Sequence, residues 1–589
     1  MILAWLLHAF YSTVFAFLFA HLRGQLTPGV AITSLLLGTW MGVKHARILR
    51  ENHPDWRFTL ALDTGGGILE IGTTCFVLYA AARHFIWMFF LSDNNWATLC
   101  ANNFGDLPLH INFIRAFANG ISLPAHNPIF ASELLRYPYG PDLYNALWEI
   151  LGVPMQSHLF FTGLLATIAS LIFLRSYAGW WGVGAFFLSG GLGGLAFFTG
   201  GSVTGLEGTL QWKNLLLAVF VTQRGVLFAL PIGLLLIISI RRHFTGQTPL
   251  TRKQWVILGV LWGFLPLFHL HAFIAVSLMM AAAAIESRGL RGLRELLLSR
   301  MAWIAYAPAS FFILFSTDFL RKAGIAHWQW GWTAGPGDLA HFLFVNFGAW
   351  LLLPIAIAAA IYFSPAPENN SKWLPASKRA LWVEFGLNCF LFFLFFNLIL
   401  APWDWDNIKL LIWPFLGFAR LAWVSVEPLL GTGSIGDLQR AAIAIALFVS
   451  GFVSVVGSLP PSRMTTIYTI EEEANTAGAL DGIPKDAVFA AAPTHNHPLT
   501  FFGRMRAVGY QGHLWSHGIQ SKKAEADLTH LVAGSADWLQ AAHDLGVTHI
   551  FWGPQERSIF GATRRPWMDS LKNVSRVKDY DIYAVSSQQ

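Results

Sequence analysis

Charged residues and cysteines are scarce in this sequence. Of its 589 residues only 12% are Asp, Glu, Lys or Arg, whereas 54% are hydrophobic, and the mean hydropathy is +0.49. Soluble domains carry about 25% charged residues, so the composition excludes a soluble globular protein and predicts a chain that crosses a membrane several times. The three cysteines Cys75, Cys100 and Cys389 are too few and too scattered for a disulfide framework or a thiolate metal site.

Long apolar runs occupy most of the chain. Runs of about 17–25 residues, the length that crosses the hydrocarbon core, recur from Ile2 to near Pro460. The first run lacks the basic start and the small-residue cleavage site of a secretory signal, so we interpret it as a retained span. The sequence therefore predicts an all-α polytopic membrane bundle over 1–460 and a soluble domain over 461–589.

Basic residues indicate the orientation of this bundle. In a membrane protein the net charge of +6 reports first on topology rather than on nucleic acid, because Lys and Arg concentrate in cytoplasmic loops. Four short basic segments are best placed in the cytoplasm: 44–57, 241–253, 287–300 and 369–379. With these fixed inside, the chain is expected to have about 13 spans, with 461–589 on the extracytoplasmic side.

This orientation places the other polar segments on the outer face. They are the large first loop 91–157, the Gly-rich 199–214, the hinge 268–273, and the segments 316–338 and 402–409. Ionisable groups avoid lipid, so these segments either line a shared extracytoplasmic cavity or are separate solvated loops.

The first loop contains a polar helix start. Apolar residues recur with helical spacing from Leu107 to Ala118, which predicts an amphipathic helix at the outer membrane surface that stops at Gly120. Asp106 stands where an N-cap belongs, and Pro108 fits the first turn. Asp106 is either this cap or a general base that accepts a proton from a nucleophile, and His110 lies one turn further on the same face.

These motifs resemble those of the GT-C superfamily of membrane glycosyltransferases. The resemblance is carried by "GDLPLHINFIRAFANGISLPAHNPIF", "RYPYGPDL", "TQRG", "WDWDNIK", "THNHPLTFFGRMRAVGYQGHLWSHG" and "WGPQER". It covers most of the chain from about Asn94 onward, is nearest to bacterial GT-C-like membrane proteins, and so implies a bacterial plasma membrane. In the superfamily an acid in this loop is the catalytic base or helps to orient the acceptor, and by position Asp106 would take that role. The sequence lacks the second acid that protein mannosyltransferases have beside this position, and it lacks the WWDYG-like string typical of oligosaccharyltransferases. Transfer of an oligosaccharide to protein is therefore less expected.

A GT-C reaction requires groups that hold the phosphate of the donor. Arg224 lies between apolar turns, where a guanidinium is costly unless it meets an anion or a carboxylate. Lys409 is a second candidate, and Asp404 and Asp406 either pair with these cations or bind sugar hydroxyls. Candidates of another kind are the imidazoles His110, His269 and His271. A metal at the two hinge histidines lacks a third ligand, so we expect no cofactor and do not favour a divalent metal.

The segment 461–589 alternates strand and helix patterns. This predicts a small α/β domain with a mainly parallel sheet. "THNHP" and "GPQER" each follow a strand, so both are expected at the carboxyl edge of the sheet. The histidines His495, His497, His513 and His517 either bind an acceptor or belong to loops that pack this domain onto the bundle.

Taken together, the residues and the resemblance predict a membrane glycosyltransferase, and the resemblance implies that it inverts the anomeric carbon. It would move a sugar from a polyprenyl-phosphate donor to a glycan, lipid or protein acceptor outside the plasma membrane, with lipid as its surroundings and no nucleic acid as partner. The alternatives are a transporter or flippase of lipid-linked saccharides and a non-catalytic scaffold that binds glycolipid.

Overall fold

A computed structural model describes residues 1–51, 67–99, 102–200, 208, 210–317, 326–335, 337–363, 377–400 and 402–585. Parts of the basic segments 44–57 and 369–379, parts of the polar segments 199–214 and 316–338, and Cys100 lie outside these residues.

The chain divides into two compact units. The helical unit comprises Met1–Tyr11, Gly38–Phe85 and Phe160–Arg463, and the mixed unit comprises Ser12–Leu37, Ile86–Leu159 and Met464–Gln589. The first loop and the segment after the last apolar run therefore belong to one unit, whereas the apolar pattern of the sequence predicts that they lie in separate domains.

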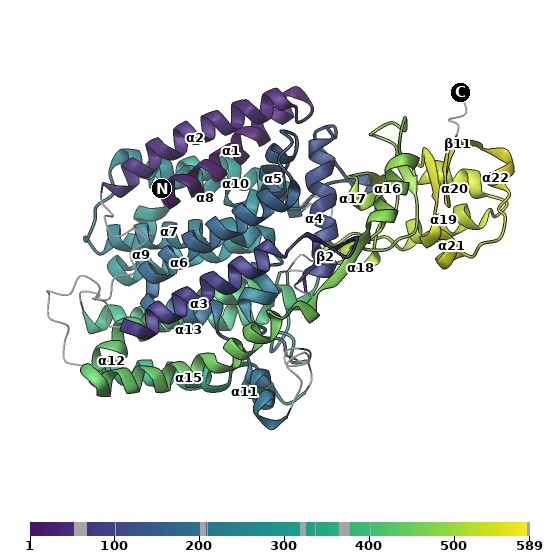
Figure 1. Cartoon of the computed structure of the whole chain (residues 1–589). Helices are drawn as coiled ribbons and strands as arrows, with labels where there is room; N and C mark the ends of the chain where they lie inside the picture. The colour runs from purple at the N-terminus through teal and green to yellow at the C-terminus, as the bar shows by residue number, and fades with distance from the viewer. Residues whose placement is uncertain are drawn as a thin grey trace. The chain divides into compact units, whose positions relative to one another are not determined.

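Long apolar helices make up most of the helical unit (Figure 1). The helices up to residue 458, other than those of the first loop, are α1 (Ile2–Arg23), α2 (Pro28–Arg50), α3 (Gly67–Ile86), α6 (Met155–Phe187), α7 (Arg224–Phe244), α8 (Arg252–Phe268), α9 (Leu270–Leu297), α10 (Arg300–Thr317), α11 (Leu339–Phe347), α12 (Leu353–Phe363), α13 (Lys378–Asn397), α14 (Ile408–Ser425) and α15 (Gly433–Ser458). Short connections are the 3₁₀ turns Leu192–Thr199, Gly348–Leu352, Asp404–Asn407, Glu427–Leu429 and Pro461–Arg463, the π-turn Leu216–Phe220, and strands β5 (His327–Trp328) and β6 (Leu398–Ile399), which pair antiparallel.

Eight helical segments in the described part of the chain are long and apolar enough to cross a membrane. They are Ile2–Arg23, Met155–Phe187, Arg224–Phe244, Leu270–Leu297, Leu339–Phe363, Lys378–Asn397, Asp404–Leu429 and Gly433–Ser458, with the shorter apolar helix Arg300–Phe315 beside them. The prediction of a multi-pass helical membrane protein agrees with this result, and the total of about 13 spans stays a prediction.

A buried carboxylate joins three elements of the helical unit. Glu427 accepts hydrogen bonds from the indole nitrogens of Trp180 (3.1 Å) and Trp181 (2.9 Å) on α6, and its other oxygen accepts from Arg440 Nε of α15 at 2.7 Å. A buried charge is stable only when it is paired and hydrogen-bonded, and Glu427 meets both conditions. It thereby fixes α6 to α15.

The mixed unit contains two sheets and short helices. Its first-loop elements are β1 (Phe90–Ser92), β2 (Asn95–Thr98), α4 (Asn103–Ala118), β3 (His126–Asn127), β4 (Phe130–Leu134) and α5 (Gly140–Glu149). Its later elements are β7 (Thr465–Thr469), α16 (Ile470–Ala479), β8 (Val488–Ala490), α17 (Pro498–Phe501), β9 (Met505–Arg506), α18 (Gln511–Ser516), α19 (Lys522–Ala533), α20 (Trp538–Asp544), β10 (His549–Trp552), α21 (Pro554–Phe560), α22 (Trp567–Ser570), β11 (Lys572–Val577) and β12 (Tyr580–Ala584).

The larger sheet is mixed rather than mainly parallel. Its strand order is β11-β12-β10-β8-β9, in which β10–β8 and β8–β9 are parallel whereas β11–β12 and β12–β10 are antiparallel. The predicted pattern of strands and helices holds for β8, α19, α20 and β10. The final hairpin, β11 and β12, adds the antiparallel part, because a tight turn can only join antiparallel strands.

The smaller sheet connects the first loop to the later chain. β2 pairs with β1 on one side and with β7 on the other, both antiparallel, and Asn95 lies opposite Thr469. α4 packs against α5, α17 and β7. The first loop is therefore built into the same fold as the residues that follow the last apolar run.

Candidate functional site

The helix that carries Asp106 begins earlier than the sequence pattern predicted. α4 starts at Asn103 with Asn102 as its N-cap, so Asp106 lies within the first turn rather than at the cap. The interpretation of Asp106 as the capping residue is wrong. A carboxylate in the first turn still interacts favourably with the helix dipole, and Asp106 is partly exposed.

α4 is enclosed rather than amphipathic. From Leu107 to Phe117 every side chain except that of Arg115 is buried. The prediction of an amphipathic helix with one apolar stripe is therefore wrong, because α5, α17 and β7 cover the other faces. The predicted stop is confirmed: Gly120 has φ +80°, and the hydrogen bonds Gly120 N–H to Phe117 and Ile121 N–H to Ala116 form a Schellman motif.

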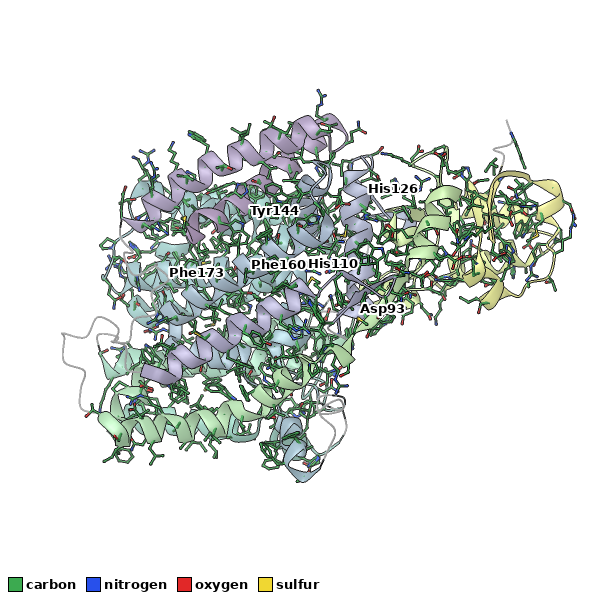
Figure 2. The ribbon with its side chains drawn as sticks, in the orientation of Figure 1. Asp93, His110, His126, Tyr144, Phe160 and Phe173 are labelled. Carbon is green, nitrogen blue, oxygen red and sulfur yellow. The ribbon has the colours of Figure 1, made fainter. Side chains whose placement is uncertain are left out.

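His110 forms a buried pair with Asp142 at the start of α5. His110 Nδ1 lies 2.9 Å and 3.1 Å from the two carboxylate oxygens, and both side chains are buried (His110 is marked in Figure 2). When Nδ1–H donates to Asp142, Nε2 carries the lone pair and can accept a proton. The described residues provide no hydrogen bond to this Nε2. The pair is arranged like the base and orienting carboxylate of many acyl-transfer enzymes.

Another histidine–carboxylate pair of the mixed unit is fully occupied. His158 uses Nδ1 with Asn145 Oδ1 at 2.9 Å and Nε2 with Glu149 Oε2 at 3.1 Å. Neither ring nitrogen therefore remains for a ligand. Because both partners of His158 belong to α5, these contacts hold α5 to the start of α6.

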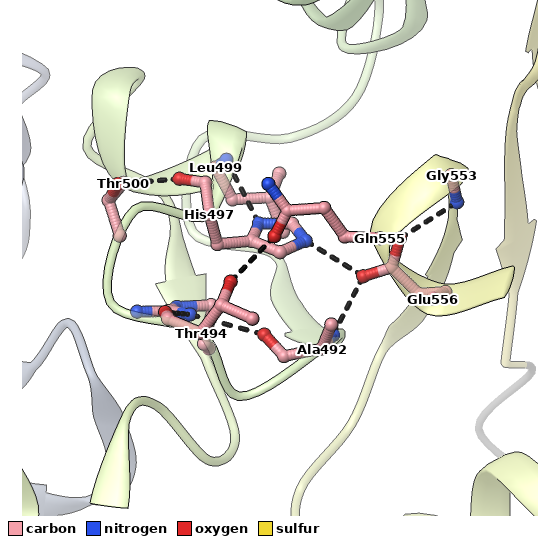
Figure 3. A network of polar contacts seen from close by, with 9 residues as sticks. Ala492, Thr494, His497, Leu499, Thr500, Gly553, Gln555 and Glu556 are labelled. Atoms are coloured by element: carbon pink, nitrogen blue, oxygen red, sulfur yellow. Dashed lines mark hydrogen bonds and ion pairs between the residues drawn. The ribbon is translucent and has the colours of Figure 1, made fainter. Parts of the chain in front are cut away.

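His497, beside the larger sheet, also uses both of its ring nitrogens in hydrogen bonds. Its Nδ1 accepts from the N–H of Leu499 at 3.1 Å, and Nε2 donates to Glu556 at 2.7 Å (Figure 3). Glu556 also accepts from the N–H groups of Ala492 and Gly553. Burial alone raises the pKa of Glu556, but His497 and these donors outweigh it and lower the pKa. The network ties "THNHP" to "GPQER" at one edge of the sheet, where the sequence placed both, and favours a structural role for His497.

Other predicted histidines lie around the N-terminal half of α4. His517 stacks on Tyr137 at 4.8 Å between ring centroids, and Tyr137 lies 6.2 Å from the His110 ring. His495 contacts the ring of Phe104 at 4.6 Å. The structure thus brings three predicted residues, His110, His495 and His517, to one region of the mixed unit.

Two more residues lie in this region: His513, which the sequence analysis names with the other histidines, and Arg506, which was missed as a site candidate. His513 donates to the carbonyl of Gly105 at 3.1 Å, directly before Asp106. Arg506 is completely buried and donates to the carbonyl of Thr494 at 2.9 Å, while its Nε and Nη2 have no hydrogen-bond partner among the described residues. Burial lowers the pKa of Arg506 to about 10. The sequence contains an ordinary arginine in a strand here, and only the packing reveals its isolation.

In the helical unit, the predicted phosphate residues gather at helix N-termini. Arg224 is the first residue of α7 and is buried. His269 is the N-cap of α9 and accepts from the N–H of Ala272 at 3.0 Å. The two helix starts touch: a Cβ on Gly225 would lie 2.3 Å from the carbonyl oxygen of Phe268 and 3.0 Å from the ring of His269.

A third helix start completes this group. Lys409 is the second residue of α14 and pairs with Asp406 at 2.9 Å. His271 lies within electrostatic range of Lys409 and Asp406, and α14 packs against α9. We name Arg224, His269, His271 and Lys409 the basic cluster. Helix N-termini and basic side chains both favour anions, so the cluster is suited to a phosphate group.

Asp404 and Asp406 do not form a metal pair with the histidines. Asp404 accepts from Gln329 Nε2 at 2.8 Å, whereas Asp406 holds Lys409. Within the described ranges, no group of three or more His, Cys, Asp or Glu is arranged to hold a metal ion. Asp406 therefore pairs with a cation, one of the two alternatives that the sequence left open, whereas Asp404 accepts from an amide, which the sequence did not predict.

Comparisons with known proteins give only a distant structural likeness. No protein-family model matches the sequence, and no curated protein matches it. The chain is similar to the Archaeoglobus fulgidus oligosaccharyltransferase tethered to an acceptor peptide containing the NVT sequon, with 11% identity, a TM-score of 0.40, and coverage of 88% of this chain and 74% of that one. The apo form gives 11%, 0.39, 88% and 75%, and AglB from the same organism, in complex with an inhibitory peptide and a dolichol-phosphate, gives 13%, 0.37, 88% and 74%. At this identity and overlap the likeness assigns no activity.

Proposed function

We propose that the chain is a membrane glycosyltransferase that moves a sugar from a polyprenyl-phosphate donor to an extracytoplasmic acceptor. The observation that supports this most is the basic cluster. Four cationic or imidazole side chains occupy the N-cap or the first two residues of α7, α9 and α14, within the apolar helical unit. Basic side chains and helix N-termini both favour an anion, and the phosphate of a lipid-linked donor would supply one.

In the proposed reaction, a hydroxyl or amine of the acceptor attacks the anomeric carbon of the donor sugar. The bond between that carbon and the phosphate oxygen breaks with inversion, and the phosphate leaves with the bonding electron pair. Arg224 and Lys409 stabilise the charge that grows on the leaving phosphate, as preorganised donors do in other group transfers. The proton of the nucleophile passes to a base.

Two groups of the mixed unit are candidates for this base. Asp106 is partly exposed in the first turn of α4 and can accept a proton directly. His110, one turn later and held through Nδ1 by Asp142, can accept at Nε2. We assign the role to Asp106 first, because its carboxylate is the more exposed.

The test is transfer by the full chain in lipid nanodiscs, with radiolabelled polyprenyl-phosphate sugars as donors and membrane extract as acceptor. We expect label transfer by the wild type, a loss of 10²-fold or more with Asp106→Asn while donor binding persists, and weaker donor binding with Arg224→Gln. His110→Gln is measured in parallel to separate the two candidate bases.

Arg291→Gln is the matched control, because Arg291 is 86% exposed and its one ion pair among the described residues is with Glu295 on its own helix. Equal transfer by Asp106→Asn and the wild type would remove Asp106 as the base. If the wild type and all variants bind the donor but none of them transfers the sugar, a scaffold or a flippase is favoured instead.

A further inference from the structure

A second charged group lies at the other end of α7 from the basic cluster. Arg241, near the C-terminus of α7, contacts Glu286 of α9 at 2.5 Å and Glu384 of α13 at 2.9 Å. Arg420 of α14 lies 3.6 Å from the same Glu384. Arg241 follows Arg224 by 17 positions of helix, or about 25 Å along the axis, so the two groups are distinct.

This group borders a cavity that presents hydrogen-bond donors. The cavity measures about 40 Å³, several times the ~10–15 Å³ that one water needs. The side chains of Tyr177, Arg241, Arg242 and Arg420 line it, whereas Glu286 and Glu384 do not. Three arginines and no acidic residue are therefore among the residues that line the cavity, which makes its lining basic.

Buried donors at this cavity lack partners. Arg420 is 6% exposed and Tyr177 is 5% exposed, yet Arg420 Nη1 and the Tyr177 hydroxyl have no hydrogen-bond partner among the described residues. The Arg420 guanidinium lies 6.0 Å from the centre of the Tyr177 ring. An unsatisfied buried donor costs about 1–3 kcal/mol, so both groups would gain from an acceptor at this place in the fold.

The fold positions these donors through an interruption of α6. Ala178 and Gly179, directly after Tyr177, leave the helical conformation. A Cβ on Gly179 would lie 2.6 Å from the indole of Trp423, which also lines the cavity. This close contact holds the Tyr177 turn of α6 against α14, the helix that carries Arg420.

We propose that this cavity is a second anion site, and that it binds a phosphate group. Guanidinium groups match phosphate oxygens bidentately, and the tyrosine hydroxyl supplies a further donor. The basic segment 241–253, which the sequence analysis placed in the cytoplasm, begins at Arg241. The phosphate therefore comes either from the headgroup of a cytoplasmic-leaflet lipid or from the aqueous phase.

The experiment measures binding to the full-length protein in phosphatidylcholine nanodiscs. One arm adds radiolabelled inorganic phosphate and uses equilibrium dialysis; the other adds phosphatidate to the lipid and counts retained phosphatidate by native mass spectrometry. Tyr177→Phe removes only the hydroxyl, and Arg242→Gln removes the charge of one lining residue. Arg420→Gln removes the central donor, and its melting temperature is recorded because Glu384 loses a partner.

We expect one retained phosphate group per chain in at least one arm. Tyr177→Phe and Arg242→Gln should weaken binding about 5-fold or more, while the exposed control Arg291→Gln should not change it. Retention of phosphatidate alone identifies a lipid headgroup, and retention of inorganic phosphate alone identifies a soluble anion. Binding in neither arm, or equal binding by the cavity variants and the control, overturns the proposal and leaves a cavity filled by water.

Discussion

Acidification is expected to destabilise the part of the mixed unit that contains His513. This side chain is 8% exposed and donates to the carbonyl of Gly105. Burial, reinforced by the charge of Arg506, lowers the pKa of His513 from 6.5 to about 4. The unfolded chain therefore binds the proton first as the pH falls, so this stabilisation is complete above pH 6.5 and is lost between about 6.5 and 4.

The size of the effect follows from the two pKa values. At pH 5 the unfolded histidine is mostly protonated and the folded one mostly neutral, which lowers the free energy of unfolding by about 2 kcal/mol relative to neutral pH. Burial also lowers the pKa of His495 and of His497, so both contribute with the same sign. The contribution of His513 is isolated by comparing the wild type with His513→Gln, which retains an N–H donor for Gly105 and does not titrate.

The assay is pulse proteolysis of the full-length protein in urea, with a C-terminal epitope that reports cleavage of the unfolded mixed unit. Between pH 7.5 and pH 5 the wild-type midpoint should fall by about 1 M urea more than that of His513→Gln. His530→Gln, at a position where the histidine side chain is 55% exposed, is the control and should follow the wild type. Parallel pH profiles for wild type and His513→Gln would refute the assignment of a lowered pKa to His513.

Two further substitutions test the packing. In Gly503→Ala the new Cβ would lie 2.5 Å from the backbone nitrogen of Ala116 in α4, at a φ of +65°. We therefore expect the free energy of unfolding to fall by about 2 kcal/mol or more in the same proteolysis assay. A fall below about 0.5 kcal/mol would contradict this contact. Glu427→Gln removes the charge that pairs with Arg440 and should lower the melting temperature in nanodiscs by several degrees, corresponding to about 3 kcal/mol, whereas an unchanged melting temperature would show that the pair contributes nothing.

Local signals in the sequence predicted local structure well. Gly120 marks the end of α4, because the Schellman motif depends only on the residues at the end of the helix and on a positive φ that glycine adopts readily. The break at His269 between α8 and α9 follows from polar residues that interrupt two apolar runs. The strand ends that carry His497 and Glu556 were placed together, because neighbouring parallel strands share a carboxyl edge.

Residues whose role depends on distant partners were not predictable. Asp142 looks like an ordinary acid in the first turn of a helix, and only its contact with His110, 32 residues earlier, distinguishes it. The enclosure of α4 was missed for the same reason, since α17 and β7 come from beyond residue 460. This interface buries polar residues of α4, such as Asn112, and their positions are not marked by apolar periodicity in the sequence.

The pairing of β2 with β7 has a consequence for how the chain is made. Asn95 and Thr469 are neighbours in one sheet but leave the ribosome about 370 residues apart, which at ~5–20 residues per second is an interval of roughly 20–75 s. During that interval the first loop has been synthesised without its third strand, and α4 without α17. The loop that carries Asp106 therefore reaches its final structure only when nearly the whole protein has been translated, so a ribosome that stalls after the last apolar run should yield a chain with its helices made and that loop still unassembled.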